Sequence, residues 1–220
     1  MDFNIAKKVI DDLFLGNLKT EYIDINKNLG YVIEFIGGEP FLEIDLIDKI
    51  IDYYFIKAIE LNLYKILINT RFSLCSNGTL YFTPKVQEFI KKHQGHISLN
   101  ITIDGIKENH DSCRVFPDGS GSYDLAIQAL NHYHQNYFGD LNSKVTISPY
   151  NINTLDKSLI SMFESGYEYI YANCVFENVW NIEYAKILYN KLKNVANYLL
   201  DNNLEEKKGS SILTIHLHEG

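Results

Sequence analysis

The stretch that most constrains this chain is 31–43, which reads YVIEFIGGEPFLE. Its first six residues are mostly β-branched or aromatic, as in a buried strand. Gly37 and Gly38 then allow a sharp turn and the close approach of another molecule, and Pro40 ends the strand. A helical apolar pattern follows directly. Ligands bind at this carboxyl end of the strands in parallel α/β folds, and Glu39 is the only charge in the turn.

The rest of the chain repeats this order of strand and helix. Strands are expected at 31–36, 64–70, 97–103, 144–148, 169–176 and 212–217, and helices at 5–14, 42–62, 84–90, 123–137, 155–164 and 182–200. Polar loops are expected at 106–121 and 201–210. Such alternation is typical of right-handed βαβ units around a parallel sheet, and both an open sheet and a curved partial barrel satisfy it. With 220 residues, 46% of them hydrophobic, the chain is expected to form one α/β domain over residues 1–220.

Composition narrows the classes of partner. The net charge is −8 and no basic stripe is present, so we expect no nucleic acid partner. No apolar run reaches the roughly 18 residues of a membrane span, and the first residues resemble an amphipathic helix more than a signal peptide. We therefore expect no membrane partner and a cytoplasmic location.

The three cysteines, Cys75, Cys113 and Cys174, lie far apart and form no close pair. This spacing argues against a disulfide framework and against a metal-ligand set. We expect the three to be small buried hydrophobic residues.

Three further motifs follow later strands. They are Ser76–Thr79 (SNGT), Thr102–Gly105 (TIDG) with His110, Asp111 and Arg114 behind it, and Gly121–Tyr123 (GSY). Each has an ordinary alternative, because Asn-Gly and Asp-Gly are common turns, His110 and Asp111 can cap a loop, and Arg114 can form a surface ion pair.

Taken together and in order, GGEP, SNGT, TIDG with its histidine, aspartate and arginine, and GSY resemble the radical S-adenosylmethionine (SAM) enzymes. They are most similar to the anaerobic sulfatase-maturating enzymes and the SPASM-type ribosomal-peptide maturases. The resemblance covers about residues 32–148. It implies a partial (β/α) TIM-like barrel, and an enzyme that uses SAM to modify a peptide or protein through a 5′-deoxyadenosyl radical.

The resemblance also implies which residues hold SAM. The GGEP turn would hold the ammonium group, Arg114 the carboxylate, and small polar groups the ribose. These assignments are chemically suitable, because a carboxylate pairs with an ammonium group and a guanidinium pairs with a carboxylate. The expected SAM-binding residues are Gly37, Gly38, Glu39, Pro40, Ser76, Asn77, Thr102, Asp104 and Arg114; the resemblance supplies no catalytic side chain.

In this family a C-x3-C-x2-C loop before GGEP holds a [4Fe–4S] cluster, and residues 1–36 contain no cysteine. The first strand and cluster loop are thus expected to be missing, and the cluster belongs to a full-length enzyme only. The leading hypothesis is an enzyme core, inactive in this form. The alternative is a non-catalytic barrel that binds a peptide or nucleotide-like ligand. An unrelated nucleotide-binding enzyme is disfavoured because no GxGxxG or GxxxxGK[ST] is present.

A missing first strand would leave the edge of strand 31–36 unpaired. An unpaired apolar edge is a template for association. We therefore expect that the chain self-associates through this edge or that its first helix folds over it.

Overall fold

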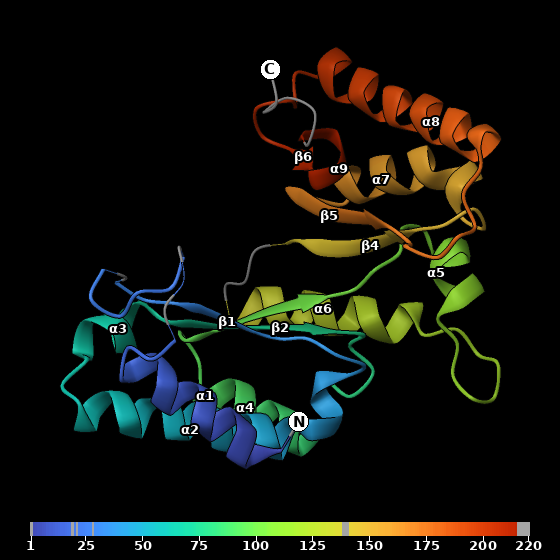
Figure 1. Ribbon diagram of the computed structural model, residues 1–220. Coiled ribbons are helices and arrows are strands. Elements are labelled where there is room, and N and C mark those ends of the chain that lie inside the picture. Colours follow the sequence, from blue (N-terminus) through green and yellow to red (C-terminus); the bar gives the residue numbers. More distant parts are fainter. Residues whose placement is uncertain (1, 19, 21, 28, 138–140, 215–220) are drawn as a thin grey trace. The chain divides into compact units, whose positions relative to one another are not determined.

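The computed structural model describes residues 2–18, 20, 22–27, 29–137 and 141–214 (Figure 1). The chain divides into two compact units. The first unit comprises Met1–Ser76 and Leu80–Leu99, and the second comprises Asn77–Thr79 and Asn100–Gly220. The single domain expected from the sequence stays a prediction.

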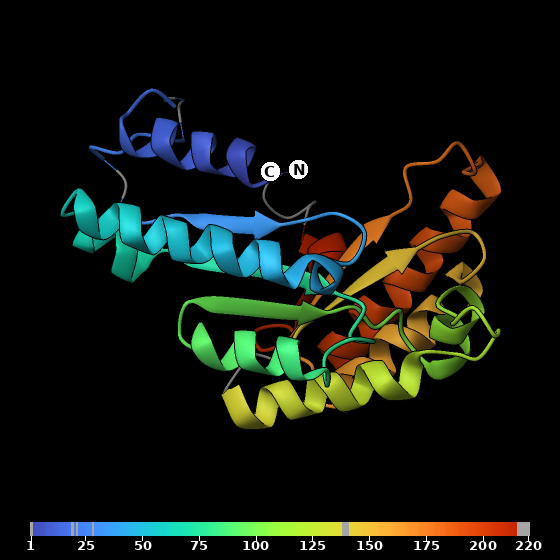
Figure 2. The same ribbon diagram turned by 90° about the horizontal axis from the view of Figure 1, so that it is seen from below.

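The first unit contains helices that flank a small parallel sheet. Its elements are α1 (Phe3–Phe14), β1 (Val32–Phe35), the 3-10 helix η1 (Pro40–Glu43), α2 (Ile44–Glu60), α3 (Tyr64–Asn69), β2 (Arg71–Ser76), α4 (Pro84–Lys92) and the start of β3 (Ile97–Ile101). The sheet has the order β1-β2-β3, and β1 runs parallel to β2 with Val32 opposite Arg71 and Phe35 opposite Leu74. Figure 2 shows β1 as the outermost strand of this sheet.

Aromatic side chains form the core between the sheet and its helices. Phe72 of β2 and Tyr54 of α2 are fully buried and meet edge to face, with ring centroids 5.4 Å apart. Phe14 of α1 packs on Tyr54, and the Tyr54 hydroxyl lies 2.8 Å from Oγ1 of Thr70. Burying aromatic surface of this kind is the main stabilising contribution in a core. Helix α1 therefore packs against α2.

The second unit carries its own parallel sheet. It contains α5 (Lys107–Cys113), α6 (Tyr123–Tyr137), β4 (Ser143–Ile147), the 3-10 helix η2 (Ile152–Thr154), α7 (Leu155–Glu164), β5 (Tyr169–Cys174), α8 (Ile182–Asp201), β6 (Gly209–Ser210) and α9 (Ser211–Thr214). Strand β5 is parallel to both β4 and β6. Helices α7 and α8 are tied together by Asp156, which accepts hydrogen bonds from Lys191 and Asn194.

The expected strand at 64–70 is wrong, because these residues form α3 and the strand follows at Arg71–Ser76. Only Ile66 of the helix is buried, whereas Phe72, Leu74 and Ser76 alternate inward along the strand. Thr70 is buried and donates to the carbonyl of Ile66, which closes the last turn of the helix. A short apolar run does not by itself distinguish the two structures.

Two other segments also differ from expectation. The loop expected at 106–121 contains helix α5, which has no apolar periodicity to signal it. The strand expected at 212–217 is wrong where it is described, because the strand lies at Gly209–Ser210 and Ser211–Thr214 are helical; residues 215–217 lie outside the described residues.

The expectation of buried cysteines is wrong as well. Cys75 and Cys174 are half-buried, Cys113 is exposed, and all three are free thiols.

No helix among the described residues is long and apolar enough to cross a membrane.

Candidate functional site

The GGEP turn of the first unit is open at both glycines. Gly37 has φ +149°, a value that side-chain-bearing residues rarely adopt. A Cβ added to Gly37 or Gly38 would meet none of the described atoms within 4 Å. Close packing against the described residues therefore does not explain why glycines occupy this turn. They leave the backbone accessible to another molecule.

Glu39 is held at the end of β1 by two donors. Its Oε1 accepts a hydrogen bond from the backbone N–H of Phe41 (3.0 Å) and another from the hydroxyl of Ser76 (2.8 Å). Ser76 ends the neighbouring parallel strand β2 and is 1% exposed. Because parallel strands end at the same edge of a sheet, an acid after one strand and a hydroxyl at the end of the next can meet there. The two donors fix the direction in which the carboxylate points.

A depression of about 410 Å³ lies beside this turn. Its walls come from β1, from the turn and from α2, and it carries carboxylates but no basic side chain. The lining residues are Glu34, Phe35, Ile36, Gly37, Gly38, Glu39, Pro40, Glu43, Leu46, Ile47 and Ile50.

Asp104 and Arg114 of the second unit form an ion pair. The Asp104 side chain is 2% exposed; its Oδ2 accepts from Nε of Arg114 and its Oδ1 accepts from the backbone N–H of Thr146 at 2.8 Å. Both carboxylate oxygens of Asp104 are thus bound within the protein. Asp104 positions the Arg114 side chain and joins the turn after β3 to β4.

His110 of α5 supports the same turn. Its Nδ1 accepts from the backbone N–H of Asp104 at 3.2 Å, and its Nε2 lies 3.1 Å from Oγ of Ser122. The Ser122 hydroxyl itself donates to the carbonyl of Arg114, so it accepts from Nε2–H of His110. The imidazole is therefore neutral and protonated on Nε2. Burial lowers the pKa of His110, and the charge of Asp104 offsets this only in part.

Asp111 locks the GSY segment against α5. Its Oδ1 accepts from the backbone N–H of Tyr123 at 2.9 Å, and Lys107 lies 3.0 Å from its Oδ2. Burial opposes ionisation of Asp111, but these bonds outweigh it and hold its pKa below the usual value. A Cβ on Gly121 would overlap the Asp111 carboxylate, so any larger residue there must displace that carboxylate.

The SNGT segment forms a local turn. Asn77 Oδ1 accepts from the backbone N–H and the hydroxyl of Thr79, at 2.9 and 2.7 Å. Gly78 has φ +78°, which suits glycine. Thr102 is 5% exposed at the end of β3. The structure thus brings Ser76 to Glu39 in the first unit and Arg114 to Asp104 in the second. The SAM-binding roles of all nine residues remain proposals.

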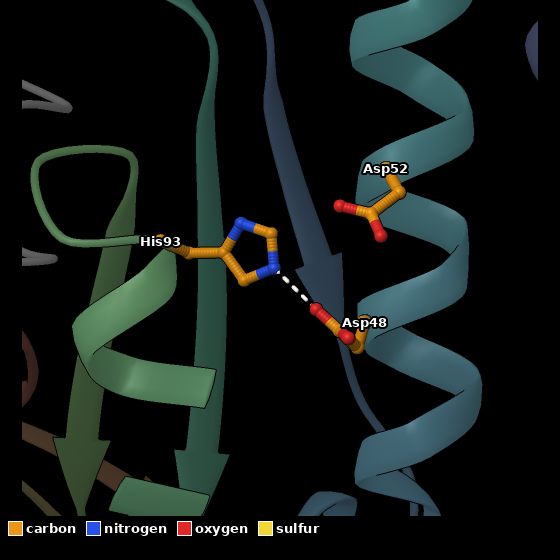
Figure 3. A group of neighbouring side chains, drawn as sticks. All are labelled: Asp48, Asp52 and His93. Carbon is orange, nitrogen blue, oxygen red and sulfur yellow. Dashed lines mark hydrogen bonds and ion pairs between the residues drawn. The ribbon is translucent and has the colours of Figure 1, made fainter. Parts of the chain in front are cut away.

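A group of side chains that the sequence did not reveal joins α2 to the end of α4 (Figure 3). His93 is 2% exposed and its Nε2 lies 2.5 Å from Oδ1 of Asp48. Lys92 donates to Asp48 at 2.8 Å and to Asp52 at 2.7 Å. Burial opposes ionisation of Asp48, but the bonds from Lys92 and His93 hold its pKa below the usual value. Lys92 supplies the positive charge that a metal ion would bring, so this group is an ion-pair network between two helices. Only the spacing of Asp48 and Asp52 on one helix face gave a signal in the sequence.

Comparison with known proteins gives two curated relatives. The radical SAM cyclopropyl synthase TigE of Paramaledivibacter caminithermalis is 23% identical over 217 residues, covering 86% of this chain and 41% of that protein. The uncharacterized protein MJ0907 of Methanocaldococcus jannaschii is 34% identical over 122 residues, covering 56% of this chain and 35% of that protein. No family model matches the chain. The chain thus spans less than half the length of either relative.

Solved structures show the same fold. The enzyme anSMEcpe with bound AdoMet has a TM-score of 0.71 at 17% identity, covering 94% of this chain and 54% of that chain. SuiB of Streptococcus suis, bound to the precursor peptide SuiA, has a TM-score of 0.56 at 14% identity, covering 96% of this chain and 42% of that chain. The fold is therefore the α/β fold with parallel strands of the radical SAM partial barrels. The resemblance of this chain to radical SAM peptide-modifying enzymes, inferred from its motifs, is confirmed.

Proposed function

We propose that this chain is the SAM-binding core of a radical SAM enzyme that modifies a peptide or protein. The observation that carries the proposal is the open GGEP turn with its oriented acid, Glu39, held by Ser76 from the next parallel strand. Anaerobic sulfatase-maturating enzyme structures contain AdoMet and peptides, as in anSMEcpe with the Kp18Cys peptide, which supports both ligand classes. The expectation of a peptide partner, without nucleic acid or membrane, is part of this proposal, as is a cytoplasmic location.

The residues fit SAM by charge. Its ammonium group would lie at the carboxylate of Glu39 and at the backbone of Gly37 and Gly38. In the second unit, the resemblance assigns the SAM carboxylate to Arg114, whose Nε is directed by Asp104. By the same resemblance, Ser76 and Asn77 would serve the hydroxyl groups of the ribose, and Thr102 would add a hydroxyl donor for the carboxylate, since small polar side chains are suitable partners.

The cysteines do not fit a [4Fe–4S] cluster. Cluster ligands in this family are three closely spaced thiolates. Cys75 lies in the first unit, Cys113 is exposed, and no three cysteines gather among the described residues. The 220-residue chain is expected to bind SAM without cleaving it, and cluster ligands would come from a longer protein.

Isothermal titration calorimetry with SAM tests the proposal. Glu39→Gln removes the negative charge and keeps the shape, and we expect at least about tenfold weaker binding, the loss of one charge-assisted contact. Glu43→Gln is the matched control, because Glu43 is an exposed acid of the same depression that the proposal gives no role in SAM binding. Equal binding by wild type and Glu39→Gln would overturn the assignment of the turn.

The second candidate function is a barrel that binds a peptide or nucleotide-like ligand without redox chemistry. The cysteine placement favours it. Anaerobic reconstitution with iron and sulfide, followed by metal analysis, separates the two. A stoichiometric cluster on the 220-residue chain would contradict our conclusion that its cysteines cannot hold one. It would instead favour the hypothesis that this chain is an active enzyme.

A further inference from the structure

Two helices of the first unit bring three side chains of metal-ligand type to one place (Figure 3). Asp48 and Asp52 lie one turn apart on α2, and His93 directly follows the last turn of α4. One carboxylate oxygen of each aspartate and one ring nitrogen of His93 all lie within 4.8 Å of one another. Carboxylate and imidazole donors together are a ligand set that divalent transition metals accept.

The His93 ring is buried and packs against two aromatic side chains. Its centroid lies 4.9 Å from that of Phe89 and 6.2 Å from that of Phe55. The backbone N–H of His93 also donates to the carbonyl of Phe89 at 3.0 Å, which anchors the residue at the end of α4. This packing directs Nε2 toward Asp48 (Figure 3). A ligand positioned in this way loses little side-chain freedom when it binds an ion.

Lys92 shows where a cation fits in this group. Its Nζ lies 2.8 Å from Oδ1 of Asp48 and 2.7 Å from Oδ2 of Asp52, so one positive charge bridges the two carboxylates. The Lys92 side chain is 44% exposed, and its flexible stem allows it to turn outward into solvent. The ammonium group and a metal ion would therefore compete for the same two acids.

A depression of about 170 Å³ lies beside the group and gives an ion a path from solvent. Its charged lining residues are three acids, Asp45, Asp48 and Glu88, and two lysines, Lys85 and Lys92. It shares no lining residue with the depression at the GGEP turn. Binding at this place is therefore independent of the proposed SAM site.

We propose that Asp48, Asp52 and His93 bind a divalent transition-metal ion such as Zn²⁺, in exchange for the ammonium group of Lys92. Tetrahedral Zn²⁺ with ligands at about 2.1 Å holds them roughly 3.4 Å apart, so side-chain shifts on the order of 1 Å suffice. Water from the adjoining depression would complete the coordination. Nε2 must offer its lone pair, so its proton moves to Nδ1 or to solvent as the ion binds. The nitrogen ligand favours Zn²⁺ over Mg²⁺ and Ca²⁺, which prefer oxygen ligands alone.

Isothermal titration calorimetry of the 220-residue chain with zinc chloride tests the exchange with Lys92. We expect Lys92→Met to tighten Zn²⁺ binding by about tenfold or more, because the competing ammonium group is gone. Lys91→Met is the matched control, since it makes the same change at the neighbouring exposed lysine, which is not among the residues of this network. It should leave the affinity unchanged. Tighter binding by Lys92→Met is a gain that misfolding does not produce.

The carboxylate ligands are tested by Asp52→Asn, which removes one charge and keeps the shape of a half-buried side chain. We expect Zn²⁺ binding to weaken by about tenfold or more. Asp45→Asn is the control, because Asp45 lies on the same helix and lines the same depression but is outside the ligand group. It should have little effect.

Long-range 15N–1H NMR spectra of the imidazole rings identify the ligand among the seven histidines of the chain. We expect Zn²⁺ to shift the Nε2 resonance of His93. The proposal is overturned if the wild-type chain binds no Zn²⁺, or if Nε2 of His93 does not shift when Zn²⁺ binds, since other side chains then hold the ion. It is also overturned if Lys92→Met binds no tighter than Lys91→Met, or if Asp52→Asn binds as well as Asp45→Asn.

Discussion

At the GGEP turn of the first unit, a Cβ on Gly38 would meet none of the described atoms within 4 Å, whereas in the second unit a Cβ on Gly121 would overlap the Asp111 carboxylate. The acidic residues of the two sites differ in the same way, one being open to solvent and the other enclosed. Glu39 lines an open depression, but Asp104 is 2% exposed and both of its oxygens are bound by the protein. The motif residues of the first unit leave open space at their turn, whereas those of the second unit mostly hold the chain in place. Spacing in the sequence does not reveal this difference.

The largest expected effect follows from removing Asp104. Asp104→Ala deletes the partner of Arg114 and the acceptor for the backbone N–H of Thr146. Breaking a buried ion pair costs roughly 3–5 kcal/mol. Because Arg114 is partly exposed, we expect the free energy of unfolding to fall by about 3 kcal/mol, the lower end of this range. Urea denaturation measures it. Asp118→Ala in the following loop should change the free energy of unfolding by less than about 0.5 kcal/mol, since the Asp118 side chain forms local hydrogen bonds to Ser120 in an exposed turn. Equal losses would show that Asp104 has no special structural role.

Gly121→Ala should come next. The added methyl group must displace the Asp111 carboxylate and so disturb its bonds to Tyr123 and Lys107. Overpacking of this kind costs about 1–3 kcal/mol. Gly38→Ala is the control at the open turn and should cost far less. A larger thermal shift for Gly38→Ala than for Gly121→Ala would reverse the comparison between the two regions.

The pH dependence of stability should report on His110. Burial lowers its pKa in the folded protein below the ordinary 6.5, so the unfolded chain binds the proton more readily. The stability contribution is therefore complete above pH 6.5 and is lost as the pH falls through the lowered folded pKa. Denaturation series at pH values from 6.5 downward should show this loss, and His110→Gln should be less stable at neutral pH, with a stability that depends less on pH in this range. An unchanged slope in the variant would contradict the neutral, buried imidazole.

The smallest effect on stability is expected for Glu39→Gln. Glu39 is half-buried, and an amide oxygen can still accept from Phe41 and Ser76. The change should cost less than about 1 kcal/mol while weakening SAM binding, which separates a ligand-binding acid from a structural one. A loss of stability as large as that of Asp104→Ala would place Glu39 in the structural class instead.

Regular helices were predictable because apolar periodicity fixes them. The bounds of α6 and α7 agree with the sequence analysis, and α4 begins at Pro84 as expected. Thr83 precedes it, but the Thr83 hydroxyl donates to the carbonyl of Leu80 and does not cap the helix. Helices α3 and α5 were missed because one is a short apolar run and the other is almost wholly polar.

The site was predictable only in part. The resemblance located the turns, and strand order explains why Ser76 reaches Glu39. The pairing of Arg114 with Asp104 and the Nε2-protonated state of His110 depend on packing between segments that no local pattern encodes. The ion-pair network of Lys92 and His93 with α2 depends on two helices meeting, and periodicity does not specify which acids and bases then face each other.

The most direct test of the central claim is a two-dimensional 15N–1H NMR titration of the 220-residue chain with SAM. We predict that the backbone amides of Gly37 and Gly38, together with Ser76, shift progressively and saturate, while the amide of Gly121 stays unchanged. A folded chain whose Gly37 and Gly38 amides do not move at saturating SAM would contradict the assignment of the GGEP turn as the ligand-binding end of the molecule.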